Sequence, residues 1–344
     1  MKAKIIHIIP TLNNGGAENI LKHLSLNLSQ RGFPQLIITL HGSTNDFHYS
    51  SLSKKILILD LNRNYKEIIN IYKKERIVVV AWMYKSIFYA LILNLFVTKF
   101  HLVFWNIRHS SFSSHQPFQK LSLYIFGFFS NILKSNIIYC AHVSKSYHER
   151  FFFRKANSVV IHNRLAKDLK FEHDDSLPPF LLYVGRYDKV KGPNRLLRII
   201  QTYFGENKEL KLFIAGSNWK EELIPTNLKN RVSLLGNVKN LSQYYSNAKA
   251  LLFTSYSEGY PNVLAEAISL GCPVVGFRAG DSKEILGDFK NGFTVESDRE
   301  FISALEKVFK KPVDLKDRIL DSKIQKKRLN FKKTVAEYEN FLLK

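Results

Sequence analysis

Residues 250–266 of the chain read ALLFTSYSEGYPNVLAE, and this stretch predicts a strand, a turn and the start of a helix. Ala250–Phe253 is a short, continuous apolar run of the kind that forms a buried strand. After Pro261, apolar residues recur at helical spacing until a glycine and a proline end the pattern. The N-terminus of a helix carries free N–H groups and partial positive charge, which favour a phosphate. The carboxylates Glu258 and Glu266 suggest a ligand that has hydroxyl groups as well as phosphates.

Strand-like and helical segments alternate along the whole chain. This alternation predicts parallel strands joined by crossover helices, and therefore an α/β fold with two doubly wound domains. We expect a first domain at residues 1–165, a charged linker at 166–179 and a second domain at 180–315. The expected strands are Lys4–Ile9, Leu36–Leu40, Ile56–Leu61, Ile77–Ala81, His101–Asn106, Asn136–Cys140, Ser158–His162, Phe180–Val184, Leu210–Ala215, Val232–Leu235, Ala250–Thr254, Val274–Phe277 and Gly292–Val295.

The composition indicates a globular, strongly basic protein. Among 344 residues, 51 lysines and arginines against 29 acidic residues give a net charge of +22, with 45% hydrophobic residues. No nucleic-acid motif is present, so an anionic membrane or substrate fits this charge better than nucleic acid does, and a solvated basic surface is the alternative. The cysteines, Cys140 and Cys272, offer no disulfide framework, which favours a reducing compartment. No apolar run reaches the ~18 residues of a membrane span, and the first run is better read as a strand than as a signal peptide.

The stretch that begins at Glu258, followed by Gly-Cys-Pro-Val-Val, resembles the family-4 retaining glycosyltransferases. The resemblance implies a GT-B fold, in which two Rossmann-like domains face each other across a cleft and a C-terminal helix, here about residues 323–344, crosses back to the first domain. It implies that Glu258 contacts the hydroxyls of the donor sugar and that Glu266 binds the nucleotide ribose. Pro261, Asn262 and Val263 would offer backbone N–H groups to the sugar and the diphosphate, and Tyr260 is a further substrate-binding candidate. A capping glutamate followed by a surface glutamate is the alternative interpretation.

A second site is predicted in Val184–Gly192, directly after the first strand of the second domain. A guanidinium and an ammonium there can neutralise a departing diphosphate, and the resemblance assigns these roles to Arg186 and Lys191. Lys189 is close enough in sequence to be confused with Lys191. Two solvated loop cations in a basic protein remain the alternative.

Gly15 and Gly16 lie between the first strand and the first helix, where glycines allow close approach of a ligand. The loop lacks the Gly-x-Gly-x-x-Gly pattern, which argues against a nicotinamide cofactor. It resembles the Gly-Gly-Ala-Glu motif of family-4 transferases, and it also fits a simple tight turn.

Further positions follow from the resemblance. His109 would touch the donor sugar, with Arg108 as the neighbour most easily confused with it. Asn237 and Val238 stand where the family has its base-binding loop, and residues 279–285 resemble its Gly-Gly-x-x-Glu-Ile motif. Arg164 replaces a glycine of the family's Pro-Asn-Gly turn. Trp82 is a candidate for the acceptor side, although a core position is the commoner role for a tryptophan.

The sequence and the resemblance together predict a retaining glycosyltransferase that uses a nucleotide-sugar donor, no cofactor and no metal. The expected acceptor is a glycan or lipid-linked glycan of a bacterial surface polysaccharide such as lipopolysaccharide, O-antigen or capsule. The alternatives are a GT-B nucleotide-sugar epimerase and a non-catalytic nucleotide-sugar-binding protein. We expect a cytoplasmic protein that can lie peripherally on the inner face of the cell membrane, held by the basic segment 310–333. The apolar segments Ile87–Thr98 and Leu121–Leu133 are interpreted as core helices rather than as membrane contacts.

Overall fold

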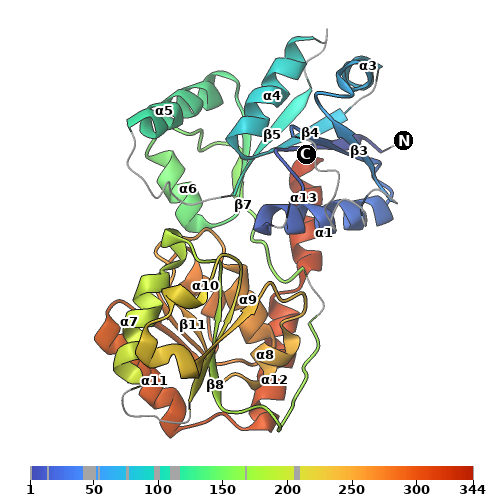
Figure 1. Ribbon diagram of the computed structural model, residues 1–344. Coiled ribbons are helices and arrows are strands. Elements are labelled where there is room, and N and C mark those ends of the chain that lie inside the picture. The colour runs from blue at the N-terminus through green and yellow to red at the C-terminus, as the bar shows by residue number, and fades with distance from the viewer. Residues whose placement is uncertain are drawn as a thin grey trace. The chain divides into compact units, whose positions relative to one another are not determined.

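The computed structural model describes residues 2–343 except for 14, 42–51, 53–54, 75–76, 97–100, 109–116, 167–168 and 205–209. The chain divides into two compact units (Figure 1). The first contains Met1–Ala166 together with Phe331–Lys344, and the second contains Lys167–Asn330. The chain therefore leaves the first unit, builds the second and returns to the first.

The first unit holds a parallel sheet whose order, among the described residues, is β3-β2-β1-β4-β5-β6-β7. Its strands are β1 (Lys4–Ile9), β2 (Gln35–Thr39), β3 (Leu57–Asp60), β4 (Ile77–Trp82), β5 (Leu102–Ile107), β6 (Asn136–Tyr139) and β7 (Ser158–Val160). Its helices are α1 (Gly16–Gln30), α3 (Tyr65–Lys74), α4 (Met83–Leu95), α5 (Pro117–Ile132), α6 (His142–Glu149) and α13 (Phe331–Leu342).

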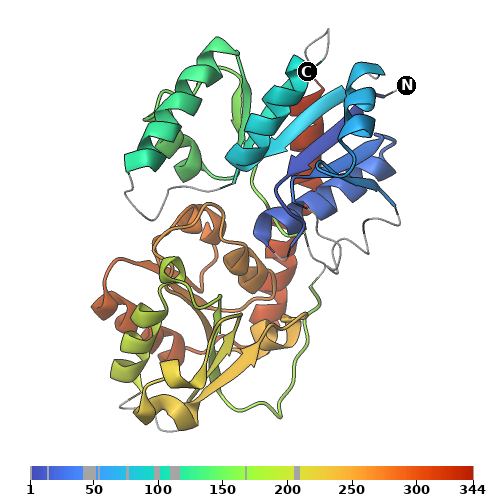
Figure 2. The same cartoon turned by 45° about the horizontal axis from the view of Figure 1, so that its top comes forward.

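Alternate residues of these strands enter two separate cores, one on each face of the sheet. Ile5 and Ile9 of β1 pack with α1 and α13, whereas Ile6 and Ile8 pack with α3 and α4. Because successive side chains of a strand point to opposite faces, continuously apolar strands require helices on both faces. Figures 1 and 2 show α1 and α13 on one side of this sheet and α4 on the other.

The second unit holds a parallel sheet of order β10-β9-β8-β11-β12-β13 in the part of the chain that the structure describes. Its strands are β8 (Phe180–Val184), β9 (Lys211–Ala215), β10 (Val232–Gly236), β11 (Ala250–Phe253), β12 (Val274–Phe277) and β13 (Gly292–Val295). Its α-helices are α7 (Pro193–Tyr203), α8 (Ser242–Asn247), α9 (Asn262–Ser269), α10 (Ser282–Leu286), α11 (Asp298–Lys310) and α12 (Leu315–Arg328). Short 3-10 helices are η1 (Lys189–Lys191), η2 (Glu221–Leu223) and η3 (Thr226–Arg231).

The strand order reverses between neighbouring strands in each unit. From β8 the chain builds outward through β9 and β10, and from β11 it builds outward in the other direction through β12 and β13. The loops that leave the carboxyl ends of β8 and β11 diverge at this point, where open α/β sheets bind their ligands. The corresponding reversal in the first unit lies between β1 and β4.

Both doubly wound α/β domains are thus confirmed, and every expected strand is present within one or two residues of its predicted bounds. The C-terminal segment differs from expectation. The helix expected at 323–344 is two helices, because Ser322 of α12 donates to the carbonyl oxygen of Ser269 in the second unit (2.7 Å), whereas Val335 and Tyr338 of α13 enter a core of the first. A helix that serves two cores breaks between them, here at Leu329 and Asn330.

The segment expected as a linker, 166–179, is attached to the second unit over much of its length. The N–H of Glu172 donates to Ser246 Oγ at 3.0 Å, and the N–H of Asp174 donates to Asn247 Oδ1 at 2.9 Å. Side chains of α8 therefore accept hydrogen bonds from the backbone of this segment, which is packed on the second unit rather than being a free linker.

Candidate functional site

Two loops meet at the strand-order reversal of the second unit, one after β8 and one after β11. Thr254 Oγ1 lies 3.1 Å from the carbonyl oxygens of both Lys191 and Gly192, to which the hydroxyl can donate. Gly192 has a φ of +68°, and a Cβ there would lie 2.1 Å from the carbonyl oxygen of Thr254. Only glycine accommodates both the left-handed backbone and this close approach. The glycine of the predicted Val184–Gly192 site therefore fixes the loop that carries the lysine against the loop that carries Glu258.

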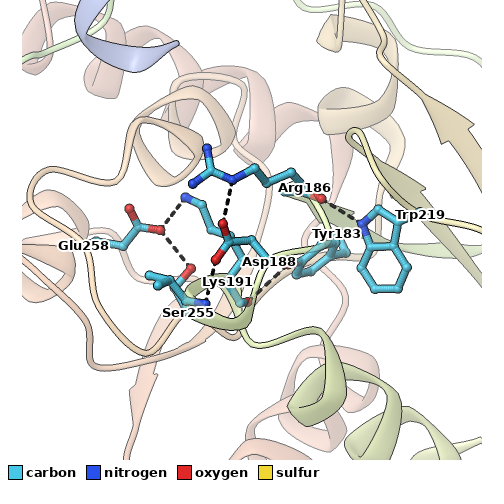
Figure 3. A network of polar contacts seen from close by, with 9 residues as sticks. Tyr183, Arg186, Asp188, Lys191, Trp219, Ser255 and Glu258 are labelled. Atoms are coloured by element: carbon cyan, nitrogen blue, oxygen red, sulfur yellow. Dashed lines mark hydrogen bonds and ion pairs between the residues drawn. The ribbon is translucent and has the colours of Figure 1, made fainter. Parts of the chain in front are cut away.

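An ion pair between Lys191 and Glu258 joins the two loops (Figure 3). Lys191 Nζ lies 2.6 Å from Glu258 Oε1, and Ser255 Oγ donates to the same oxygen at 2.8 Å. The lysine side chain is 25% exposed and the glutamate 14%, so the pair is largely shielded but can still be reached from solvent. Hydrogen bonds between charged groups are short and strong, so this pair holds both side chains in place.

Arg186 is held on the same loop by an acidic neighbour. Its Nε donates to Asp188 Oδ2 at 3.0 Å, while Asp188 Oδ1 accepts the backbone N–H of Val190 at 2.9 Å. The Val190 N–H, and then the Arg186 guanidinium, lower the pKa of Asp188, which therefore carries its negative charge at neutral pH. Arg186 remains exposed, with 58% of its side chain open to solvent.

The sequence left open whether Lys189 or Lys191 is the lysine of the site, and the structure distinguishes them. Lys189 and Lys191 are both in η1, but Lys189 is exposed, whereas Lys191 is half-buried and paired with Glu258. The 3-10 turn that carries both lysines is capped by Asp188, whose side chain accepts from the backbone N–H of Val190. The geometry therefore favours Lys191 as the lysine of the site.

Two aromatic residues that the sequence analysis did not single out hydrogen-bond to the backbone of the β8 loop. The Tyr183 hydroxyl donates to the carbonyl oxygen of Lys191 at 3.1 Å, and Trp219 Nε1 donates to the carbonyl oxygen of Gly185 at 2.9 Å (Figure 3). Burial raises the pKa of Tyr183, so its phenol keeps the proton that it donates. The Trp219 contact is invisible in a sequence because it joins segments about 30 residues apart.

The helix α9 begins as the sequence predicts, with Pro261 as its N-cap and Glu266 one turn inside. Proline has no N–H, so the backbone donors in this first turn belong to Asn262 and Val263, and the expectation that Pro261 contributes an N–H is wrong. Tyr245 is fully buried in α8, and its hydroxyl donates to Glu266 Oε2 at 3.1 Å. Burial raises the pKa of Tyr245, so the neutral phenol orients the carboxylate of Glu266.

The stretch at 279–285 lies against the loop that carries Glu258. Gly280 has a φ of +59°, and a Cβ there would lie 2.3 Å from the carbonyl oxygen of Gly259. The N–H of Asp281 donates to the same oxygen at 3.0 Å. The structure thus brings together two motifs that the sequence separates by about 20 residues. Tyr260, next to Gly259, is buried.

Asn237 and Val238 follow β10, which lies two strands from β8 across β9. The N–H of Gly216, after β9, donates to the carbonyl oxygen of Gly236 at 2.8 Å. Asn237 is exposed and Val238 is half-buried. These residues lie at the same edge of the sheet as Lys191, which is where strand ends converge in a parallel sheet.

In the first unit, Gly15 is the N-cap of α1 and Gly16 its first residue. Gly15 has a φ of −144°, which any residue can adopt, and a Cβ there would meet only the flexible side chain of Glu18. The backbone conformation of Gly15 therefore does not itself require glycine. Asn14 lies outside the described residues.

His109 also lies outside the described residues, and its neighbour Arg108 has a structural role. The Arg108 guanidinium donates to Asn163 Oδ1 and to the Tyr338 hydroxyl (3.4 Å), and it stacks over the ring of Trp82 at 5.3 Å. Trp82 is fully buried, and its Nε1 donates to His7 Nδ1 at 3.2 Å. Trp82 is therefore a core residue rather than a lining residue of an acceptor site.

Arg164, which stands where the family pattern has a glycine, has a left-handed backbone. Its φ is +30°, and its guanidinium donates to both carboxylate oxygens of Glu337 on α13, at 2.7 Å each. The two-pronged ion pair offsets the cost of a left-handed arginine. The substitution thus attaches α13 to the turn that follows β7.

Comparison with known proteins identifies relatives of this site and fold. Residues 167–327 match the family model described as glycosyl transferases group 1. The chain is 35% identical, over 165 residues, to the N-acetylgalactosamine-N,N'-diacetylbacillosaminyl-diphospho-undecaprenol 4-alpha-N-acetylgalactosaminyltransferase of Campylobacter jejuni, covering 46% of this chain and 42% of that protein. It is 28% identical, over 214 residues, to the GalNAc-alpha-(1->4)-GalNAc-alpha-(1->3)-diNAcBac-PP-undecaprenol alpha-1,4-N-acetyl-D-galactosaminyltransferase of the same organism, covering 57% of this chain and 58% of that protein.

The chain spans about half the length of these two curated relatives. A solved structure, Anabaena Alr3699/HepE in complex with UDP and glucose, matches 99% of both chains with a TM-score of 0.79 and 16% identity, which shows a shared fold. Residues 167–327, which carry Arg186, Lys191, Glu258 and Glu266, therefore match the glycosyl transferases group 1 model, in a chain with the GT-B fold of two Rossmann-like domains.

Proposed function

We propose that this protein is a glycosyltransferase that moves a sugar from a nucleotide-sugar donor to a glycan or lipid-linked glycan in the synthesis of a bacterial surface polysaccharide. The observation that carries the proposal is the pair of Lys191 and Glu258, with Arg186 on the same loop, at the strand-order reversal of a group 1 domain. The two Campylobacter relatives are named for transfer to undecaprenol-linked acceptors, which supports a lipid-linked acceptor here.

The ion pair suggests how the site responds to its donor. In the structure Glu258 neutralises Lys191 at 2.6 Å. A diphosphate beside Nζ competes for the ammonium, and Glu258 is then released to accept hydrogen bonds from sugar hydroxyls. One exchange of partners thus prepares the lysine for the leaving group and the glutamate for the sugar.

Charge stabilisation is the chemical task that these residues perform. As the bond from the sugar to the diphosphate breaks, negative charge grows on the phosphate oxygens. Lys191 and the exposed guanidinium of Arg186, oriented by Asp188, stabilise that charge without moving far. The N–H groups of Asn262 and Val263 at the start of α9 add to this field.

The remaining roles follow the family pattern and are part of the proposal. Glu266, oriented by Tyr245, binds the ribose hydroxyls, and Asn237 and Val238 bind the base. The departing diphosphate assists attack by the acceptor on the same face of the sugar, so the configuration at the anomeric carbon is retained. Gly15, Gly16 and His109 complete the proposed contacts with the substrates, and the protein works in the cytoplasm at the inner face of the cell membrane.

The proposal is tested by measuring nucleoside diphosphate release from a panel of nucleotide sugars, with and without lipid-linked acceptors. UDP sugars come first, because the Anabaena structure contains UDP. We expect release that depends on both donor and acceptor. Conversion of the donor without any acceptor would instead identify an epimerase, and donor binding without turnover on any acceptor would identify a binding protein.

A further inference from the structure

The helix α5 exposes six large apolar side chains, whereas Leu123 is buried in the core and Phe126 packs against it partly buried. Among the residues of α5 whose burial the structure describes, 119–132, the buried ones are Leu123, Gly127 and Ser130. A Cβ at Gly127 would lie 1.8 Å from the carbonyl oxygen of Phe151, so the glycine lets α5 pack closely on the turn after α6. The outward residues repeat at intervals of three and four, are 44% to 62% exposed, and are Leu121, Tyr124, Ile125, Phe128, Phe129 and Ile132.

This arrangement is the reverse of what an isolated soluble fold favours. A helix on a sheet normally turns its wide apolar stripe towards the core and its polar side chains towards water. Contiguous apolar surface of this kind usually marks a binding surface. The sequence prediction that residues 121–133 are core is therefore wrong for these six side chains, and a partner is needed to explain them.

A second observation extends the same surface. Phe152 follows α6 with a φ of +61° and is 68% exposed. A left-handed backbone is unfavourable for an aromatic residue, and such strain persists where the surroundings enforce it. The turn at Phe152 is tied to α5, since Asn131 Nδ2 donates to the carbonyl oxygen of Phe152 at 2.6 Å. The rings of Tyr124 and Phe152 are 5.9 Å apart, which makes Phe152 continuous with the α5 stripe.

The charges around this surface indicate the kind of partner. Between residues 117 and 157 the sequence has six lysines and arginines and one acidic residue, Glu149. Lys120, Lys134, Arg150 and Lys155 are exposed. Basic residues beside an apolar helix face attract anionic lipid headgroups. A second copy of this chain would instead bring the same positive charge to the contact.

The length of α5 determines how it can meet a bilayer. Its 16 residues extend for about 24 Å, and among the described residues no helix is long and apolar enough to cross a membrane. A helix with an apolar face and basic flanks lies in the plane of the headgroups.

We propose that the outward stripe of α5 and Phe152, together called the α5 face, insert into the interface of a bilayer that contains anionic phospholipids. This goes beyond the proposed activity, because it names the surface that binds lipid and needs neither donor nor acceptor. It also differs from docking through the basic segment 310–333, whose helix α12 belongs to the second unit.

Vesicle co-sedimentation distinguishes lipid binding through the α5 face from lipid binding through α12. The full chain should bind vesicles of phosphatidylcholine mixed with phosphatidylglycerol, and the Phe128→Glu/Ile132→Glu variant should bind them at least ~10-fold more weakly. The matched control is Leu320→Glu/Ile324→Glu on α12, where the side chains are similarly exposed, at 57% and 51%. The control should bind within about threefold of the full chain. Unchanged binding by the α5 variant, or a loss confined to the α12 variant, would overturn the proposal.

Insertion is measured by a label. Phe128→Cys can be modified selectively with an environment-sensitive fluorophore, because the native Cys140 and Cys272 are buried. Its emission should shift to the blue on vesicles and be quenched by acyl-chain quenchers, whereas a label at Glu306→Cys on α11 should show neither effect. An unshifted label on bound protein would contradict insertion. So would a lipid-free dimer that Phe128→Glu dissociates, since the α5 face would then be a protein interface.

Discussion

At the scale of single residues, the environment rather than the residue type decides which side chain can act. Lys189 and Lys191 are chemically identical and two positions apart, yet only Lys191 is half-buried against a carboxylate. Arg108 and Arg164, which could be taken for substrate-binding cations, instead attach α13 to the first unit. The sequence identified the candidate cations, and the contacts separated them.

The two lysines provide a matched test of the site. We expect Lys191→Ala to lose about 2–4 kcal/mol of transition-state stabilisation, as other preorganised electrostatic sites do. Lys189→Ala should keep near-normal turnover, because Lys189 is exposed and outside the pair. The measurement is kcat/KM with saturating acceptor. Equal losses in the two variants would remove Lys191 from the proposed site.

His7 provides a prediction on stability and pH. The residue is fully buried, with Trp82 donating to Nδ1 and Gln35 Oε1 beside Nε2 at 3.0 Å. Burial lowers the pKa of His7 to about 4 from an ordinary 6.5. Below pH 6.5 the unfolded chain takes up a proton that the folded chain does not. The free energy of unfolding should therefore fall by about 3 kcal/mol as the pH drops from 6.5 to 4, and be unaffected by this group above 6.5.

The test is urea unfolding of the wild type and of His7→Gln, which cannot titrate, across this pH range. The difference between their pH slopes isolates His7 from the other titratable groups. Parallel slopes for the two proteins would show that His7 protonates normally in the folded state.

At the scale of elements, glycines determine how closely the loops of the site approach. Gly192 and Gly280 both have left-handed backbones, and each would bring a Cβ within 2.3 Å of a carbonyl oxygen on the β11 loop. The sequence predicted both loops and their order, but it could not show that they touch. The same close packing appears at Gly127, where a small residue allows α5 to expose its apolar face.

Gly192→Ala should therefore lower the free energy of unfolding by more than the same substitution at an ordinary left-handed glycine. Gly32 has a φ of +82°, and a Cβ added there would have no neighbour within 4 Å, so Gly32→Ala should cost only the backbone term, about 1–2 kcal/mol of unfolding free energy. Gly192→Ala adds a clash with Thr254 and should cost about 2–5 kcal/mol. Denaturant unfolding measures both. Equal costs would show that the loops separate easily, and turnover should fall only in Gly192→Ala.

At the scale of the whole molecule, the chain crosses between units through the break between α12 and α13. The proposed contacts with the nucleotide all lie in residues 167–330, whereas α13 is held to the first unit by Arg164 and by Phe331, Val335 and Tyr338. The proposed nucleotide contacts therefore belong to the second unit, whereas α13 packs in a core of the first unit. Stabilisation by a ligand should be confined to the unit that binds it.

Amide hydrogen exchange, measured segment by segment, shows which unit the ligand stabilises. A nucleoside diphosphate at 100 times its Kd should add about 2.7 kcal/mol to the opening free energy of the second unit. Amides of β8, β11 and α9 should show this protection, while those of β1 and β4 stay unchanged. Protection confined to β1 and β4 would place the nucleotide in the first unit instead.

The sequence by itself determined the fold class, the strands and the candidate chemistry, because each depends on local patterns. Apolar runs such as Ala250–Phe253 define buried strands wherever they occur, and their alternation with helices requires parallel sheets. Only the tertiary structure decided that Lys191 rather than Lys189 faces Glu258, that Trp82 is core, and that α5 turns its aromatic face outward. These outcomes depend on contacts between segments distant in sequence, and residue spacing along one segment cannot report what packs against it.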